Sequence, residues 1–323
     1  MEDCINLHPR CRNPPEFFPL RVVDVGSPDG AEEPRLKIDQ QSRAPWVALS
    51  HCWGGGISSA TLSSNVHRRF EVLPMPYLPV NFRDAITITR ALGYRYLWID
   101  ALCILQDSQT DWQSHLSQMG NIYQFAVVTI AADVASDSNT GILLKRHQAA
   151  ISVPVPYRSL SLEAEGVLYF RPLLFESPRG PIQKRDWTLQ EGLLSVRSLN
   201  FSEDQLLWQC QTTKIIEGEI DIPDTQGRYR GAAFPYLKRS FLLPNGQSDV
   251  DKKRDPLDTE VFMSTPSGEA LDHGYLIVNE YVKRSLTVEQ DRFPALSGIA
   301  SQIQERTGYQ QSHTQLSFSL VLF

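Results

Sequence analysis

The chain has 323 residues, of which 41% are hydrophobic, and its 37 acidic and 31 basic residues give a formal net charge of -6. This hydrophobic fraction is ample for one large core or two smaller ones, so we expect a globular protein. The charged residues are interspersed and form no basic stripe, which argues against nucleic acid as a partner.

Two further features bear on where the protein works. No apolar stretch near the N-terminus has the length of a signal peptide, and none approaches the roughly 20 apolar residues that cross a bilayer. The five cysteines are an odd number, which favours reduced thiols over a disulfide framework. We therefore expect a cytoplasmic protein without a membrane span.

Residues 1–44 are expected to form a leader in front of the main domain. Within them, Cys4, His8 and Cys11 would share one face of a helix, and these side-chain types bind zinc. Three ligands without an evident fourth leave a structural zinc site incomplete. A packed leader helix is therefore the preferred interpretation, and no metal is expected.

From residue 46 onward, apolar runs alternate with helical patterns, which is typical of a parallel α/β sheet. The helical run before Gly93 ends there because glycine favours the left-handed conformation of a helix C-terminus. The expected elements are a strand over 46–52, a helix over 82–92, a strand over 96–105, a helix N-capped by Asp111, and a strand over 125–132.

The rest of the chain is less regular and is taken in segments. Residues 133–180 are rich in Ser, Pro and Gly and predict an insertion that contains short strands. Residues 216–274 predict a long polar loop with disorder at its middle. The other expected elements are insertion strands over 151–155 and 167–170, a helix over 187–194, a hairpin of 198–201 with 206–210, and helices over 275–284 and 295–306 in a partly irregular C-terminal extension, 275–323.

Three aromatic-rich blocks follow one another along the chain, and two shorter motifs lie between the second and the third. The blocks are Trp46–Gly55 (WVALSHCWGG), Tyr96–Asp107 (YLWIDALCILQD) and Arg185–Leu194 (RDWTLQEGLL), and the shorter motifs are Met119–Tyr123 (MGNIY) and Val128–Ala132 (VTIAA).

These blocks resemble the signature blocks of the fungal heterokaryon incompatibility (HET) domain. The resemblance covers roughly residues 1–215 and returns near 287–300, and it implies a HET domain over residues 45–215. It also implies an effector of heterokaryon (vegetative) incompatibility, which means non-self recognition and regulated cell death. The partners so implied are an upstream incompatibility sensor or allelic partner protein, and further copies of the chain through self-association.

The third block pairs Trp187 with Glu191, and a four-residue spacing puts both side chains on one face of a helix. This pair resembles the catalytic Trp/Glu arrangement of TIR domains that hydrolyse NAD. The resemblance implies a TIR-like (flavodoxin-like), mostly parallel sheet with flanking helices, and hydrolysis of NAD or a related nucleotide. Glu191 would then orient the nicotinamide ribose and stabilise an oxocarbenium-like transition state. NAD would be a substrate, and no cofactor is required.

The remaining site residues follow from the general location of ligand sites in open α/β sheets, which is outside the carboxyl ends of the strands. This rule brings together the residues after the first strand and those at the end of the second. With Glu191 as the catalytic residue, the expected substrate-binding residues are Trp187, Ser50, His51, Trp53, Gly54, Asp100, Cys103 and Asp107.

A nucleophilic-cysteine enzyme is a rival interpretation. It would use Cys103 or Cys52 as the thiolate, His51 as the base and Asp107 to orient the imidazole. Cysteines within apolar strands are, however, most often inert small hydrophobic residues.

Two non-catalytic interpretations also fit the sequence. The aromatic blocks could build the core of a signalling module that works by assembly, with Glu191 as an ordinary helix residue. The chain could also be an inactive, truncated copy, because residues 310–323 depart from the family pattern after Asp291–Ala300.

Overall fold

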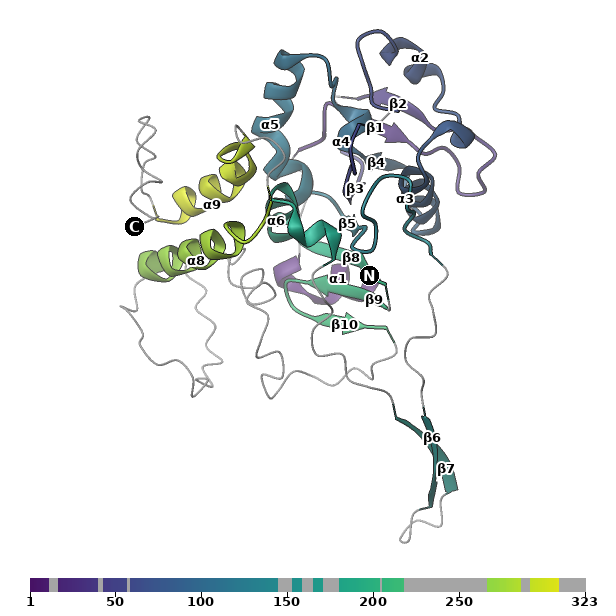
Figure 1. The fold of residues 1–323 in the computed structure, drawn as a ribbon, viewed down its shortest axis with the longest axis vertical. Coiled ribbons are helices and arrows are strands. Elements are labelled where there is room, and N and C mark those ends of the chain that lie inside the picture. The colour runs from purple at the N-terminus through teal and green to yellow at the C-terminus, as the bar shows by residue number, and fades with distance from the viewer. Residues whose placement is uncertain are drawn as a thin grey trace.

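The computed structural model describes ten stretches of the chain, and the fold is described for these residues alone. In this part of the chain, a large sheet is flanked by helices, and a small two-stranded sheet lies apart from it (Figure 1). The described residues are 1–11, 17–39, 43–56, 59–144, 153–158, 165–170, 180–203, 205–217, 266–285 and 291–307.

The strands are β1 (Arg21–Asp24), β2 (Arg35–Ile38), β3 (Trp46–Ser50), β4 (Tyr96–Trp98), β5 (Val128–Ala131), β6 (Val153–Arg158), β7 (Glu165–Phe170), β8 (Arg197–Phe201), β9 (Leu206–Cys210) and β10 (Lys214–Ile216). The α-helices are α1 (Glu2–Leu7), α2 (Val66–Glu71), α3 (Val80–Ala91), α4 (Asp100–Cys103), α5 (Gln109–Gln124), α6 (Trp187–Leu194), α8 (Pro266–Tyr281) and α9 (Ser297–Thr307). Short 3-10 helices are η1 (Pro9–Cys11), η2 (Met75–Tyr77), η3 (Pro181–Lys184) and η5 (Pro294–Leu296).

The large sheet has the strand order β10-β9-β8-β5-β3-β4-β1-β2. The central pairs β8–β5, β5–β3 and β3–β4 are parallel, whereas β1–β2, β1–β4, β8–β9 and β9–β10 are antiparallel pairs. The prediction of an α/β fold with flanking helices is confirmed, and the strands at the centre of the sheet are parallel as expected, whereas the antiparallel outer pairs make the whole sheet mixed. For β8–β9 and β9–β10 the cause is a short connection, because a short turn can join only antiparallel neighbours.

Within the parallel centre, the strands lie in the order β4-β3-β5-β8, which is second, first, third and fourth along the chain. This is the order of the first four strands in flavodoxin-like sheets. In such sheets, the strand order reverses next to the first strand, and ligands bind outside the carboxyl ends of the strands at that point. Here that point lies between β3 and β5.

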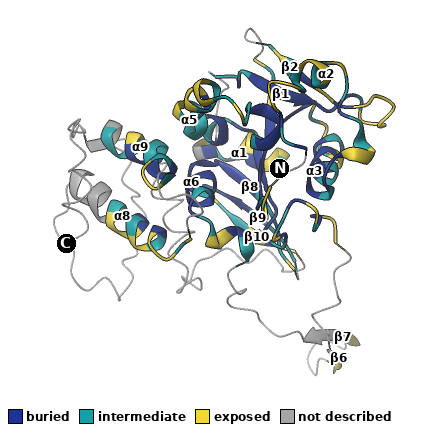
Figure 2. Cartoon of the chain, turned by 45° about the horizontal axis from the view of Figure 1, so that its top comes forward, coloured by how far each residue is buried: buried dark blue, intermediate teal, exposed yellow. Residues whose placement is uncertain are grey.

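The core lies on the central strands, which Figure 2 shows as buried. Trp46 in β3 and Trp98 in β4 are fully buried, as expected for large aromatic residues inside apolar strands. The Trp46 indole donates a hydrogen bond to the Ile122 carbonyl at 3.1 Å, and the Trp98 ring meets the Tyr123 ring edge-on at 5.6 Å. These contacts attach α5 to β3 and β4 of the sheet.

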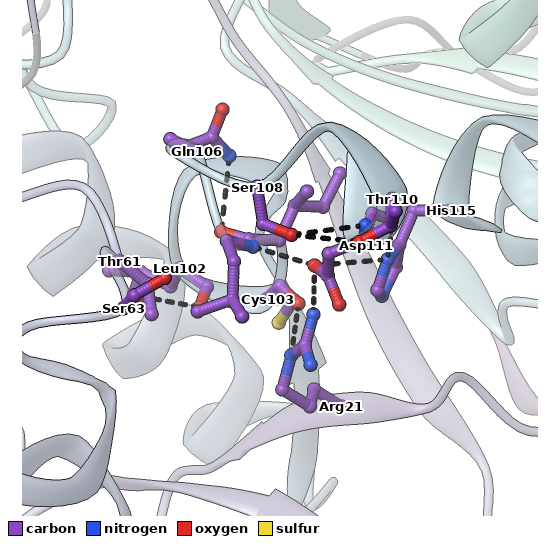
Figure 3. Close-up of polar contacts among 12 residues, drawn as sticks. Arg21, Thr61, Ser63, Leu102, Cys103, Gln106, Ser108, Thr110, Asp111 and His115 are labelled. Carbon is purple, nitrogen blue, oxygen red and sulfur yellow. Dashed lines mark hydrogen bonds and ion pairs between the residues drawn. The ribbon is translucent and has the colours of Figure 1, made fainter. Parts of the chain in front are cut away.

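Two details of the second block differ from the prediction. The strand expected over 96–105 is β4 followed by the short helix α4, because the Asp100 carboxylate accepts the Ala101 amide at 2.7 Å and turns the chain. Ser108, and not Asp111, caps α5, since its hydroxyl accepts the Asp111 amide at 3.3 Å. The Asp111 carboxylate instead pairs with Arg21 of β1 (Figure 3).

The segment expected as a leader, residues 1–44, contributes to the main sheet. It supplies β1 and β2, and β1 pairs with β4 in the antiparallel direction. These two strands are four residues long and carry charged residues such as Arg21 and Arg35, so they lack the long apolar run that marks a buried strand.

The later elements match the sequence more closely. The helix expected over 187–194 is α6, the expected hairpin is β8–β9, and the expected insertion strands are the antiparallel pair β6–β7, with 151 and 152 outside the described residues. The loop expected over 216–274 is shorter, because α8 begins at Pro266; residues 218–265 lie outside the described part. The stretch expected to depart from the family pattern, 310–323, also lies outside it.

The C-terminal helices α8 and α9 pack beside α5 and α6 (Figure 1). They share a second small core with α6, centred on Leu193, Ile277 and Ile299. Where α5 crosses α9, Gly120 and Gly298 bring the two backbones into contact. No helix among the described residues combines the length and apolar character needed to cross a membrane.

Candidate functional site

A buried carboxyl group lies at the carboxyl end of the central strand β3. Ser50 is the last residue of β3, and its hydroxyl donates a hydrogen bond to Oε2 of Glu191 on α6. Both residues are almost fully buried, with exposed fractions of 4% for Ser50 and 7% for Glu191. The first and third sequence blocks therefore meet at this hydrogen bond.

The environment of Glu191 raises the pKa of its carboxyl group to about 7. Burial is the largest cause, because a charged carboxylate loses its hydration, and the negative charge of Asp100 acts in the same direction. The Ser50 hydroxyl, the Arg185 guanidinium and Tyr123 favour the charged form and limit the increase. Glu191 therefore changes its charge near neutral pH, as groups that transfer protons or stabilise charge in enzymes often do.

His51, which directly follows β3, is a buried neutral side chain. Its Nδ1 lies 3.9 Å from Oδ1 of Asp100, and its ring meets the Phe82 ring edge-on at 5.2 Å. Burial lowers the pKa of His51, which keeps the imidazole uncharged. Among the described residues, its Nε2 has no hydrogen-bond partner.

Asp100 links the first block to the second, as expected for residues at the ends of adjacent parallel strands. Its Oδ2 accepts the Trp53 indole N–H at 2.8 Å, and its side chain is 22% exposed. Gly54 has a φ of +74° and lies so close to Asp137 that a Cβ would come within 2.0 Å of the aspartate Cβ. A glycine is therefore required where this loop turns away from Trp53.

Three further residues belong to this neighbourhood and were not predicted as site residues. Arg185 donates from Nη1 to the His51 carbonyl at 2.8 Å, and Tyr123 donates its hydroxyl to the Leu49 carbonyl at 3.1 Å. Burial raises the pKa of Asp133, just after β5, to about 7. Three sequence features could have indicated them. Arg185 is the charged residue that begins the third block, Tyr123 lies in the Met119–Tyr123 motif, and Asp133 follows the end of a strand.

Two of the predicted substrate-binding residues make their contacts elsewhere. The Trp187 indole donates to Asp291 Oδ2 at 3.2 Å and packs on the small core of α6, α8 and α9. Asp107 is exposed, and its Oδ1 accepts the Ser63 amide at 2.8 Å. These hydrogen bonds connect neither Trp187 nor Asp107 to Glu191.

Cys103 lies in a separate network, which Figure 3 shows around Asp111. Arg21 donates from Nε to the Cys103 carbonyl at 2.7 Å and also pairs with Asp111, and the Asp111 Oδ2 accepts the Leu105 amide at 2.8 Å. Burial raises the pKa of the Cys103 thiol to about 12, and burial raises that of Cys52 as well. Neither thiol has the setting that would make it a thiolate nucleophile at neutral pH.

The site thus belongs to a mixed α/β domain in which three blocks converge on a buried glutamic acid. The family model of heterokaryon incompatibility (HET) proteins matches residues 46–191, from the first residue of β3 to Glu191 itself. Over this range the chain is similar to the family, and the resemblance seen in the three blocks is confirmed. Neither the curated proteins nor the solved structures contain a match to the chain.

Proposed function

We propose that this protein acts in heterokaryon incompatibility as a cytoplasmic effector of regulated cell death. The match of residues 46–191 to the HET family model supports the incompatibility role. Its trigger would be an incompatibility sensor or an allelic partner protein, and activation would involve association between copies of the chain.

The chemistry proposed for this effector is TIR-like hydrolysis of NAD or a related nucleotide, with Glu191 as the catalytic residue. The observation that carries this proposal is a buried carboxyl group with a pKa of about 7, at the carboxyl end of the first parallel strand. The flavodoxin-like order of the parallel strands also supports it, because ligands of such sheets bind at that edge.

In this mechanism, the bond between the ribose anomeric carbon and the nicotinamide nitrogen breaks. The bonding electron pair leaves with nicotinamide, and water adds to the anomeric carbon and releases one proton. A ribose hydroxyl takes the place that the Ser50 hydroxyl holds beside Glu191 in the structure. The Glu191 carboxylate then stabilises the positive charge that develops on the sugar.

Other side chains of the cluster assist this step. Arg185 contributes a positive charge beside His51 and Glu191, which suits a substrate phosphate. His51 remains neutral, and its Nε2, which lacks a partner among the described residues, offers a hydrogen bond to a bound nucleotide. The Trp53 indole N–H donates to Asp100 Oδ2 at 2.8 Å and thereby positions this carboxylate beside the site.

A non-catalytic assembly module is the second candidate. Two observations favour it. Glu191 is only 7% exposed, and the Trp187 indole bonds to Asp291 and does not lie beside Glu191 as a surface on which a substrate could stack. In that case, the bond between Ser50 and Glu191 would simply join α6 to the sheet.

The deciding experiment measures nicotinamide release from NAD by the purified protein over a range of protein concentrations. We expect turnover by the wild type that rises with concentration, and a loss of at least about 100-fold in Glu191→Gln and Glu191→Ala. Glu203→Gln is the matched control, because Glu203 is an exposed carboxylate on the β8–β9 turn, and it should retain full activity.

Circular dichroism and thermal unfolding of each variant establish that the fold is kept. Wild-type protein without turnover at any concentration would contradict the hydrolase. Activity that survives in folded Glu191→Gln would remove Glu191 from the chemistry.

A further inference from the structure

Three cysteines and one histidine converge at a place distant in sequence from the three blocks. Cys4 lies on α1, His8 follows that helix, Cys11 ends η1, and Cys210 ends β9. One ligand atom from each residue lies within 4.8 Å of all the others. The sequence showed the first three residues and lacked a fourth, which the fold supplies from 202 positions beyond His8.

The spacing of these atoms suits a single ion in their midst. The His8 Nδ1 lies 3.5 Å from the Cys210 Sγ and 4.0 Å from the Cys11 Sγ. Zinc–sulfur bonds of about 2.3 Å and zinc–nitrogen bonds of about 2.0 Å place tetrahedral ligand atoms about 3.5 to 3.8 Å apart. Shifts of less than about 1 Å would therefore convert the cluster into a tetrahedral site.

We propose that Cys4, His8, Cys11 and Cys210 bind one Zn²⁺ ion in a tetrahedral structural site. Three thiolates and one imidazole form a ligand set that zinc takes in closed structural sites. Thiolates also disfavour the hard cations Mg²⁺ and Ca²⁺, which prefer oxygen ligands. Protein atoms would occupy all four coordination positions of the ion. The site would therefore stabilise the fold, and it would have no open position for a reacting water molecule.

The surroundings of the sulfur atoms support bound thiolates. The turn after β9 directs the backbone amides of Thr212 and Thr213 at the Cys210 Sγ, at 3.4 Å and 3.3 Å. The Thr212 hydroxyl lies 3.6 Å from the Cys11 Sγ. Hydrogen-bond donors of this kind orient metal ligands and stabilise the negative charge on sulfur.

The charge of the proposed site is balanced by Arg197. This buried guanidinium donates from Nε to the Cys4 Sγ at 3.3 Å and from Nη2 to the Cys11 carbonyl, and no carboxylate of the described residues forms an ion pair with it. A buried cation requires a compensating negative charge. Three thiolates and Zn²⁺ sum to one negative charge, which Arg197 neutralises.

Simple packing of cysteines as small hydrophobic residues explains less. Among the residues that the structure describes, the apolar members of this cluster besides the cysteines are Val196 and the partly buried Trp208. Packing gives no reason for an imidazole among three thiols, or for two amides aimed at one sulfur. Cys52 contrasts with it, since that thiol packs against Ala131 and Ile182.

The test measures the zinc content of protein that is purified without a polyhistidine tag, under reducing conditions and without chelators. We expect about one zinc ion per chain in the wild type, and a loss of at least about tenfold in Cys210→Ser and Cys11→Ser. Cys52→Ser is the matched control, a buried thiol outside the cluster, and should keep its zinc. Wild-type protein with less than about one tenth of an ion per chain, or Cys210→Ser with its zinc retained, would overturn the proposal.

A second measurement covers the case in which the serine variants do not fold. Wild-type protein is stripped of metal under reducing conditions and titrated with Co²⁺. Tetrahedral cobalt gives intense visible bands, and its thiolate ligands add charge-transfer bands in the ultraviolet, with an end point at about one equivalent. The site would be contradicted by the weak visible bands of octahedral cobalt. It would also be contradicted if protein whose five thiols are all reduced bound no Co²⁺.

Discussion

At the scale of single residues, Glu191 carries an energetic cost that depends on pH. Its pKa is about 7 in the folded protein and 4.5 in an ordinary setting, so folding favours the protonated form. The protonated carboxyl group therefore contributes to the stability of the folded state. This contribution is complete below pH 4.5 and is lost as pH rises through about 7. The difference corresponds to about 3 kcal/mol at alkaline pH.

This cost leads to a test with the neutral isostere. Glu191→Gln removes the charge and still offers a carbonyl oxygen to the Ser50 hydroxyl. Relative to the wild type, we expect the variant to gain about 2 to 3 kcal/mol of unfolding free energy between about pH 5 and pH 8. Urea unfolding at both pH values measures this change. An equal difference at both pH values would mean that Glu191 titrates normally.

The test compares a variant with the wild type because the buried histidines change the pH dependence of stability in the opposite direction to Glu191. Burial lowers the pKa of His51 and of His115 below 6.5. Their contribution to stability is present above that value and is lost as pH falls. The wild-type curve alone therefore mixes both effects, whereas the difference between variant and wild type isolates Glu191. Glu203→Gln, at an exposed position, should show no such difference.

At the scale of elements, the attachment of α9 to α5 depends on two glycines. A Cβ on Gly298 would lie 3.0 Å from the Gly120 Cα, 3.0 Å from the Gln190 Oε1 and 3.1 Å from Leu194 Cδ1. The Gly298 amide also donates to that Gln190 oxygen at 2.8 Å. Three close neighbours leave little room for a side chain.

We expect Gly298→Ala to lower the unfolding free energy by about 1 to 2 kcal/mol, because overpacking exceeds the gain in helix propensity. Gly274→Ala on α8 is the control. Its added Cβ meets only Ile303 Cδ1 at 3.6 Å, so propensity should leave it neutral or slightly stabilised. Chemical denaturation of both variants measures the effect. A stable Gly298→Ala would mean that α9 does not pack closely on α5.

The agreement between sequence and structure differs from element to element. The helix α6 and the hairpin β8–β9 could be predicted because periodicity and turn residues are local signals. The helix α4 could not, since Ala101 to Cys103 is apolar and resembles a continued strand. A four-residue helix has too few turns to display its period.

The candidate site could be predicted only in part, for the same reason. The rule for strand ends places Trp53 near Asp100, and they form a hydrogen bond. The same rule does not predict the hydrogen bond between Ser50 and Glu191, which are 141 positions apart. It also does not predict the hydrogen bond from the Trp187 indole to Asp291. Such contacts depend on how α6 and the C-terminal helices pack, and spacing along the chain carries no information about that packing.

At the scale of the whole molecule, protection of the backbone should be uneven. The strands β3, β4 and β5 are buried along their whole length, whereas residues 154–158 and 165–167 of the β6–β7 sheet are exposed. A two-stranded sheet without a covering layer is marginally stable in water.

We therefore expect hydrogen exchange to separate the two sheets. Amides of 46–50 and 128–131 should exchange slowest, and those of Val155, Tyr157, Arg158 and residues 165–167 should exchange at nearly the rate of an unfolded chain. Mass spectrometry after brief labelling measures this at low protein concentration. Strong protection of β6–β7 that appears only at high concentration would instead reveal an interface between copies of the chain.

The contact between α1 and β8 has a consequence for how the chain is made. The Arg197 guanidinium that binds the Cys4 sulfur is 193 positions further along. At about 5 to 20 residues per second, a ribosome needs about 10 to 40 s to synthesise that length. Because β8 also covers the free edge of β5, the nascent chain carries that apolar edge uncovered until the same moment.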